Sequence, residues 1–350
     1  MYFSPDRVPP SPAASFADAI LAGIEQSAPI VGAEEIECDI VPKELPIGMD
    51  LHGYRILKAL GAGGFGVTYL AEESWLARRV VIKENFPDTL CYRSGRTLEV
   101  CLNDPDCGAS GYEWARGNFL KEARVLASLD HPYIAKVYSY FEANNTAYYV
   151  TEYIDGLSLG DLAMDYAQCG HPLSQNALLG LMVRLLDALD YMHGKQLLHR
   201  DIKPDNILIT RNGLPILIDF GAARESYGDL IPNFVESRGF TPPEQLKEGG
   251  NLGPWSDLYA LGATFYYILK GSFLPDCHQR ELYDRATPLS ADPELLAVYS
   301  PALLRSIDRA CSPSIAERYA SAAAWLADLN ETRLTPASEQ EITQASLPRA

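Results

Sequence analysis

The alternation of hydrophobic and polar positions changes character once along the chain. Between Tyr54 and Tyr153, short runs rich in β-branched and aromatic residues predict β-strands, and one stretch has helical spacing. The strand-like runs read YRILKAL, VTYLAEE, RVVIKE, AKVYSYF and TAYYVTEY, and the helical stretch reads NFLKEARVLASL. We therefore expect a mostly antiparallel sheet with one helix in this part of the chain.

Long helical periods dominate after Gly156. The segment SQNALLGLMVRLLDALDYMHG has Ser174 to start a helix and Gly194 to end it. Its apolar face is expected to comprise Leu178, Leu179, Met182, Leu185, Leu186 and Leu189. A second helix is predicted over SDLYALGATFYYILKG. This order predicts an α+β fold with a small β lobe over residues 51–153 and a larger helical lobe over 154–330, and a ligand is expected in the cleft between them.

Three segments fall outside this pattern. Residues 1–50 contain repeated Pro and Ser, nine acidic and two basic residues, and are predicted to be a solvated tail. Within it, SFADAILAGIEQ predicts a short amphipathic helix, for which docking on the folded body is favoured over partner recruitment. Residues 331–350 are polar without a sustained period and are expected to be a loose end.

The third exceptional segment, at about 89–117, exceeds the usual length of a loop. It carries three cysteines but no Cys-x-x-Cys pair, which disfavours a metal site. We expect a partly ordered flap there.

Composition and charge limit the classes of function. The net charge of −17 over 350 residues opposes binding to nucleic acid or to anionic lipid, both of which require basic surfaces. No stretch approaches the roughly 18 unbroken apolar residues of a membrane span. The seven cysteines are odd in number and unevenly spaced, and the first residues lack a secretory pattern, so a cytoplasmic location is expected.

A glycine-rich string is the first candidate for chemistry. Residues 61–66 read GAGGFG, a spacing that lets backbone amides approach phosphate oxygens without an intervening Cβ. A dinucleotide-binding fold would start a helix here, but Val67 and the residues after it continue as a strand. The string therefore predicts a hairpin lid over phosphates, although taken alone it is also compatible with a turn that binds nothing.

Lys83 ends the strand-like run VVIK and can reach under this hairpin as a positive charge for phosphate. Glu122 lies on the one predicted helix of the small lobe, where its carboxylate can pair with the Lys83 ammonium. Such a pair would orient the lysine rather than provide a base.

Two further strings carry acidic residues at characteristic positions. HRDIKPDN occupies residues 199–206, and ILIDFG occupies residues 216–221. An Asp beside an Asn in one loop, and a second Asp at a strand end, supply a carboxylate for an acceptor hydroxyl and oxygen ligands for Mg²⁺. Two ordinary polar turns are the competing interpretation, which the order of all the motifs disfavours.

Together these motifs resemble the eukaryotic-like (Hanks-type) Ser/Thr protein kinases over residues from about Tyr54 to Leu329. The strings GxGGFGxTYLA, KExFP and PPEQ are similar to bacterial members. The resemblance implies a bilobal protein-kinase fold, ATP and Mg²⁺ as cofactors, and a protein substrate with a Ser or Thr hydroxyl. It leaves autophosphorylation open.

The resemblance also implies the roles of individual residues. Asp201 would be the catalytic aspartate, and Lys203 would contact the γ-phosphate. Lys83, paired with Glu122, would anchor the α- and β-phosphates. The implied metal ligands are Asn206 and Asp219. The implied nucleotide contacts are Gly61, Ala62, Gly63, Gly64, Phe65, Gly66 and Val67, together with the gatekeeper Thr151 and backbone groups of Glu152 and Ile154.

Four downstream residues have implied structural roles. Glu244, in Thr-Pro-Pro-Glu, would form a buried ion pair with Arg318. Asp257 would brace the catalytic loop (residues 199–206) through backbone amides, with a plain helix cap as the alternative. Ser237 would contact the catalytic aspartate and lysine.

Two other functions remain as alternatives. A pseudokinase scaffold would bind nucleotide or a partner without turnover, and the intact Lys83, Asp201, Asn206 and Asp219 argue against it. A small-molecule kinase of the same fold would act on a metabolite, and the Pro-Pro-Glu segment, typical of a peptide-docking shelf, argues against that.

Overall fold

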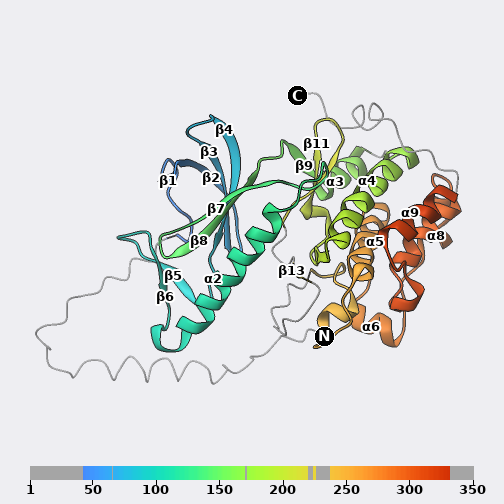
Figure 1. Cartoon of the computed structure of the whole chain (residues 1–350). Helices are drawn as coiled ribbons and strands as arrows, with labels where there is room; N and C mark the ends of the chain where they lie inside the picture. The colour runs from blue at the N-terminus through green and yellow to red at the C-terminus, as the bar shows by residue number, and fades with distance from the viewer. Residues whose placement is uncertain (1–41, 65, 170–171, 220–223, 226–236, 332–350) are drawn as a thin grey trace, which may run out of the picture. The chain divides into compact units, whose positions relative to one another are not determined.

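The computed structural model describes residues 42–64, 66–169, 172–219, 224–225 and 237–331. The short helix predicted near the N-terminus, Phe65 and the predicted C-terminal tail beyond residue 331 lie outside these ranges. The described part comprises a small lobe built on an antiparallel sheet and a larger, mainly helical lobe (Figure 1).

The small lobe is a six-stranded sheet with one long helix. The strand order is β1-β2-β3-β4-β8-β7, and every neighbouring pair is antiparallel. The strands are β1 (Asp50–Leu51), β2 (Tyr54–Ala62), β3 (Gly66–Glu73), β4 (Arg78–Asn85), β7 (Val137–Ala143) and β8 (Thr146–Glu152). The helix α2 (Pro105–Ala127) packs against β7 and β8. The alternating pattern of the strands buries Ile56, Tyr69 and Ile82 in the core of this lobe.

The segment expected to be a flap has regular structure. It forms a two-stranded hairpin of β5 (Cys91–Arg93) and β6 (Val100–Leu102), followed by the first half of α2. Bonds from Val100 N to Asn144 O (2.8 Å) and from Tyr112 Oη to Asn145 O (2.8 Å) fasten both parts to the turn between β7 and β8. The hydrophobic period predicted α2 only from Asn118 onward, because three glycines lower the helix propensity of the residues before it.

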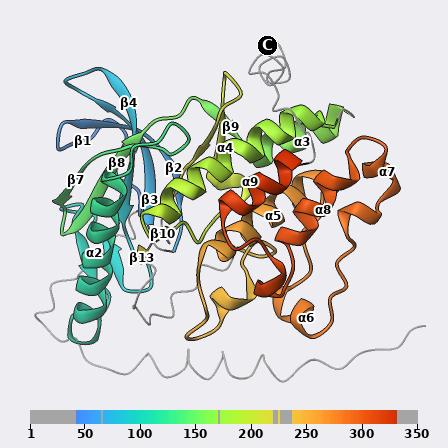
Figure 2. The ribbon, with the colours of Figure 1, turned by 45° about the vertical axis from the view of Figure 1, so that its right-hand side comes forward.

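The larger lobe is built from seven described α-helices. They are α3 (Leu159–Cys169), α4 (Gln175–Gly194), α5 (Pro254–Lys270), α6 (Cys277–Leu282), α7 (Pro293–Leu296), α8 (Pro301–Ala310) and α9 (Ala322–Glu331). Short 3₁₀ turns are η1 (Pro204–Asn206), η2 (Pro243–Leu246), η3 (Leu289–Ala291) and η4 (Ile315–Glu317). Helix α4 packs against α9, and α5 packs against α8, as Figure 2 also shows.

The central helix α4 has the predicted ends and the predicted apolar face. The Ser174 hydroxyl accepts a bond from Ala177 N (3.2 Å), which satisfies one of the first free amides of the helix. The six apolar residues predicted for its inner face are all buried. The second predicted helix corresponds to α5, which ends at Gly271 in the left-handed conformation (φ 68°).

Short strands in the larger lobe position the two acidic motifs. Strands β9 (Gly156–Ser158), β11 (Ile207–Thr210) and β12 (Pro215–Leu217) form one small sheet. Strand β10 (Leu197–Leu198) pairs with β13 (Arg224–Glu225). The first acidic motif therefore lies between β10 and β11, and the second begins in β12.

Backbone bonds connect these strands to the chain that follows α2. Leu217 N donates to Tyr133 O (2.8 Å), and Ala135 N donates to Leu217 O (2.9 Å). Ile218 N donates to Asn206 O (3.0 Å), so the two acidic motifs lie side by side. Over the described ranges, none of the helices combines the length and the apolar character needed to span a bilayer.

Candidate active site

The glycine-rich string is a hairpin turn, as predicted. Gly61 and Ala62 end β2, Gly66 and Val67 begin β3, and Gly63 N donates to Gly66 O (2.9 Å) to close the turn. A Cβ at Gly66 would lie 2.3 Å from the Glu84 carbonyl oxygen, so packing against β4 requires glycine there.

Packing does not explain the other glycines of the turn. A Cβ at Gly61 or at Gly63 would meet no protein atom within 4 Å. Their lack of a side chain therefore leaves backbone accessible from outside the protein, which is the property needed to approach a phosphate group.

Lys83 forms an ion pair across the two lobes. Its Nζ, on β4 of the small lobe, pairs with Asp219 Oδ1, which follows β12 in the larger lobe. The Lys83 Nζ also lies 6.0 Å from the ring centroid of Tyr149, the residue opposite it on β8. The structure thus brings together a lysine and an aspartate from sequence motifs far apart in the chain.

The ion pair of Lys83 is with Asp219, and the pairing of Lys83 with Glu122 that the motifs imply stays a prediction. Glu122, on α2, nevertheless lies in the same neighbourhood. Burial, followed by the nearby carboxylates of Glu122 and Asp219, raises the pKa of the Tyr149 hydroxyl far above its ordinary value. Glu122 and Asp219 therefore both lie near Tyr149, and Asp219 also contacts the Lys83 ammonium.

Two residues of the acidic motifs have left-handed backbone conformations. Arg200 has φ 64° and Asp219 has φ 60°. Aspartate tolerates this region better than most residues, whereas arginine at such a position is unusual and indicates local strain. Strain of this kind persists only where surrounding contacts hold the loop in place.

The Asp201 carboxylate is held by three side chains. Its Oδ1 accepts from Ser237 Oγ (2.7 Å), and its Oδ2 accepts from Lys203 Nζ (2.8 Å) and Asn206 Nδ2 (2.8 Å). Lys203 Nζ also donates to Ser237 Oγ (3.2 Å). The expected contact of Ser237 with both residues is confirmed.

Asn206 is oriented by its amide nitrogen. Its Nδ2 donates to both the backbone oxygen and Oδ2 of Asp201, each at 2.8 Å. This orientation turns Oδ1, the atom able to ligate a cation, away from those two acceptors. Among the residues that the structure describes, no group of three or more His, Cys, Asp or Glu side chains could hold a metal.

The pair Asn206 and Asp219 fits Mg²⁺ because this ion retains waters and substrate phosphate oxygens and needs only one or two protein ligands. The structure brings the two residues close through the bond between Ile218 N and Asn206 O. The donor set is composed of oxygen atoms, as a hard cation requires.

A buried histidine shows that the two aspartates converge. His199 is completely buried, and burial lowers its pKa although the carboxylates of Asp257, Asp201 and Asp219 act in the opposite direction. The carboxylates of Asp201 and Asp219 are therefore both close enough to this imidazole to act on its pKa.

Asp257 braces the catalytic loop from the N-terminus of α5, as expected. Its Oδ2 accepts from His199 N (2.9 Å) and its Oδ1 from Arg200 N (2.8 Å). His193 Nε2 lies 2.8 Å from Asp257 Oδ2, a contact that sequence reasoning missed. Burial alone would raise the pKa of Asp257, but His193, His199 and the Arg200 amide outweigh it and lower that pKa.

The remaining site residues occupy the expected elements. Thr151 and Glu152 are the last residues of β8, and Ile154 follows that strand. Glu152 N donates to Lys136 O (2.8 Å), which anchors the end of β8 to the chain leading into β7. Glu244 pairs with Arg318 (2.7 Å), and both side chains are buried, which confirms the expected structural ion pair.

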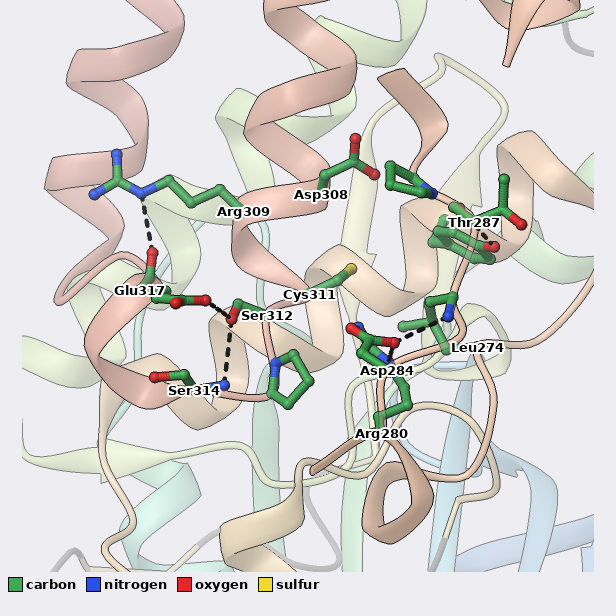
Figure 3. A pocket seen from close by; sticks show the side chains of 14 residues that line it. Leu274, Arg280, Asp284, Thr287, Asp308, Arg309, Cys311, Ser312, Ser314 and Glu317 are labelled. Carbon is green, nitrogen blue, oxygen red and sulfur yellow. Dashed lines mark hydrogen bonds and ion pairs between the residues drawn. The ribbon is translucent and has the colours of Figure 1, made fainter. Parts of the chain in front are cut away.

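A separate cavity of about 490 Å³ lies in the larger lobe (Figure 3). None of the candidate catalytic residues lines it. Its polar lining is engaged internally, since Arg280 pairs with Asp284 (2.9 Å) and Ser312 Oγ donates to Glu317 (2.7 Å). The first contact lies within the segment around α6 and the second within the chain that follows α8, and both are structural.

Comparisons with known proteins agree with this geometry. The family described as Protein kinase domain matches residues 108–313. Serine/threonine-protein kinase PknA of a Nostoc species is 35% identical over 77% of this chain and 45% of the relative. Serine/threonine-protein kinase C of a Synechocystis species is 33% identical over 80% of this chain and 50% of the relative. The chain thus spans about half the length of these curated relatives.

A solved structure extends the similarity to most of the chain. The structure called PpkA-294, in its apo form, is 34% identical and has a TM-score of 0.72. The match covers 82% of this chain and all of that one. The chain therefore belongs to the protein kinase domain family, with bacterial Hanks-type serine/threonine-protein kinases among its relatives.

Proposed function

We propose that this chain is an ATP-dependent protein serine/threonine kinase that works with Mg²⁺. The observation that carries this proposal is the convergence of Lys83, Asp201, Asn206 and Asp219. An ion pair joins Lys83 to Asp219, a side-chain bond joins Asn206 to Asp201, and a backbone bond holds the two loops together.

ATP would bind with its phosphates under the β2–β3 turn. The backbone of Gly61 and Gly63 is accessible there, and the Lys83 ammonium supplies positive charge for the α- and β-phosphates. The adenine would lie against the end of β8, near Thr151 and the backbone groups of Glu152 and Ile154. The net negative charge of the chain makes this local positive charge important for binding.

Asn206 Oδ1 and the Asp219 carboxylate would hold Mg²⁺. When bound, the metal neutralises phosphate charge and orients the triphosphate. Asn206 contributes through its fixed amide orientation, and Asp219 contributes through its position at the contact with Lys83.

Phosphoryl transfer would then require one proton acceptor. The substrate hydroxyl oxygen bonds to the γ-phosphorus, the bond from that phosphorus to the β–γ bridging oxygen breaks, and ADP leaves. Asp201 aligns the hydroxyl and accepts its proton, while Lys203 balances charge on the γ-phosphoryl group. Ser237 and Asn206 keep the Asp201 carboxylate in position.

A protein is the favoured acceptor over a metabolite. The segment that follows Ser237 leads into η2, where Glu244 is fixed by the buried Arg318. This anchored segment lies next to Asp201 through the Ser237 hydroxyl and would support an extended peptide near the catalytic aspartate. The chain's own Ser and Thr residues are further candidate acceptors.

Radiolabelled ATP with a generic basic protein tests the proposal. We expect phosphate transfer to protein by the wild type, and at least a 100-fold loss in Asp201→Asn, which removes the proton acceptor while sparing Mg-ATP binding. Asp219→Ala should also abolish transfer. Asp190→Asn, at an exposed position of α4, is the matched control and should keep full activity. Wild-type binding of nucleotide without any transfer would instead favour a scaffold, and transfer only to a metabolite pool would favour a small-molecule kinase.

A further inference from the structure

The residue beside Lys83 belongs to a buried polar network. Successive side chains of a strand point to opposite faces, so Glu84 points away from the Lys83–Asp219 contact. Its carboxylate accepts from Tyr69 Oη (2.7 Å), Tyr148 Oη (2.6 Å) and Arg93 Nη2 (2.6 Å). Any displacement of this carboxylate would therefore move the backbone that carries Lys83.

Arg93 connects this network to the inserted hairpin. The side chains of Arg93 and Glu84 are both fully buried. The Arg93 guanidinium also donates from Nε to Lys43 O (2.6 Å) and from Nη1 to Leu98 O (2.9 Å). A buried salt bridge whose other donors are satisfied forms a rigid connection, because any movement would leave a buried charge without a partner.

A second connection runs to the glycine-rich turn. Asp88, in the chain that follows β4, donates its backbone N–H to Gly64 O (3.1 Å) at the tip of this turn. The Asp88 carboxylate pairs with Lys43 Nζ (2.5 Å), and Leu45 N donates to Tyr69 Oη (3.1 Å). Residues 43–45 therefore contact Asp88, which holds the glycine-rich turn, and also contact the network around Glu84.

We propose that Lys43 and Arg93 are positioning residues that set the affinity for ATP, by holding the glycine-rich turn and Lys83 in the geometry that receives the phosphates. This inference rests on the proposed function, because that function gives the turn and Lys83 their role. If these groups are already fixed before ATP binds, the entropic cost of ordering them on binding is smaller. Loss of the connections should therefore weaken ATP binding more than it slows the transfer step at saturating ATP.

The exposed pair gives the first test. In Lys43→Met and in Asp88→Asn we expect KM for ATP to rise about three-fold with kcat unchanged, as suits a partly exposed ion pair. The double variant Lys43→Met/Asp88→Asn should show no further rise in KM, and Lys43→Arg, which keeps the positive charge, should have the wild-type KM. The matched control is Arg55→Met, which removes another exposed ion pair of the same lobe, with Glu72, and should leave KM unchanged.

The buried pair gives the second test. Arg93→Met alone leaves Glu84 buried without its cation, so it is combined with Glu84→Gln, which removes both charges and keeps an acceptor for a tyrosine hydroxyl. We expect this double variant to fold, as measured by its circular dichroism spectrum and a cooperative thermal transition. Its KM for ATP should rise more than about ten-fold with a much smaller change in kcat, because the variant also loses the Arg93 bonds to Lys43 O and Leu98 O that connect Glu84 to the neighbouring chain.

The outcomes separate this inference from the proposed function. Wild-type chain that transfers no phosphate would refute the kinase proposal, and calorimetric titration with Mg-ATP would then test the positioning role through the dissociation constant. Active wild type with unchanged KM in Lys43→Met and in the folded double variant would overturn the inference. A fall in kcat and a rise in the dissociation constant for ATP by the same factor in every variant, including Arg55→Met, would also overturn it. Such a pattern would indicate general destabilisation.

Discussion

At the scale of single residues, burial determines how much each ion pair contributes to stability. The Glu244 side chain is 6% exposed and that of Arg318 is 0% exposed, and Glu244 Oε1 also accepts from Ser256 Oγ (2.8 Å). Breaking such a pair leaves a charge in a poorly solvated place, which typically costs about 3–5 kcal/mol. The exposed pair Arg55–Glu72 lies at the other extreme, where a contribution of about 0–1 kcal/mol is usual.

Arg318→Met should therefore lower the free energy of unfolding by about 3–5 kcal/mol. Urea denaturation followed by fluorescence measures this change, and Arg55→Met should lose at most about 1 kcal/mol in the same experiment. Adding Glu244→Gln to Arg318→Met should recover part of the loss, because the unpaired buried charge is then gone. Equal losses in the single and double variants would show that packing of the arginine, rather than charge, is what matters there.

At the scale of elements, the N-terminus of α5 and the catalytic loop form one buried unit with an expected pH dependence. Burial lowers the pKa of His199, while Asp257, Asp201 and Asp219 act against that shift. An unfolded histidine has a pKa of about 6.5, so below that pH the unfolded chain binds a proton that the folded chain does not. Acidification should therefore reduce stability.

We expect the free energy of unfolding to fall from about pH 6.5 downward by at most about 1.4 kcal/mol per pH unit from His199. The pKa of Asp257 is lowered in the folded state, so its own contribution is lost only below about pH 4. Urea titrations between pH 8 and pH 5 can be compared with those of His199→Asn, in which this group no longer titrates. Parallel pH curves for wild type and variant would contradict the assignment to His199.

The same scale shows what sequence reasoning can and cannot reach. Helix α4 and the glycine-rich hairpin were predictable because a strong hydrophobic period or strand alternation marks them. The start of α2 was not, because its glycines weaken the local signal and the contact of Tyr112 with the β7–β8 turn stabilises it from outside. His193 and Arg93 were missed for a related reason, since their partners Asp257 and Glu84 are identified only by the packing of separate elements.

At the scale of the whole molecule, the candidate site is assembled from both lobes. Lys83 and Asp219 come from different lobes, and their motifs are identifiable from sequence, whereas their direct contact is not. Local sequence patterns indicate the kind of group at each position, but a contact between residues 83 and 219 depends on how β4 and the chain after β12 are placed in three dimensions. A ligand that contacts both lobes should therefore stabilise the folded chain as a unit.

Binding of Mg-ATP should raise the melting temperature of the whole chain. At a free ligand concentration of about 100 times the dissociation constant, the stabilisation is about 2.7 kcal/mol. For a body of this size each kcal/mol raises the melting temperature by about 2–4 °C, so an increase of about 5–10 °C is expected. Differential scanning fluorimetry measures this increase. It should fall sharply with EDTA present and in Asp219→Asn, and persist in Asp190→Asn. An increase that is the same in Asp219→Asn and independent of EDTA would mean that ATP binds elsewhere on the molecule, because a site built on Asp219 cannot be indifferent to both changes.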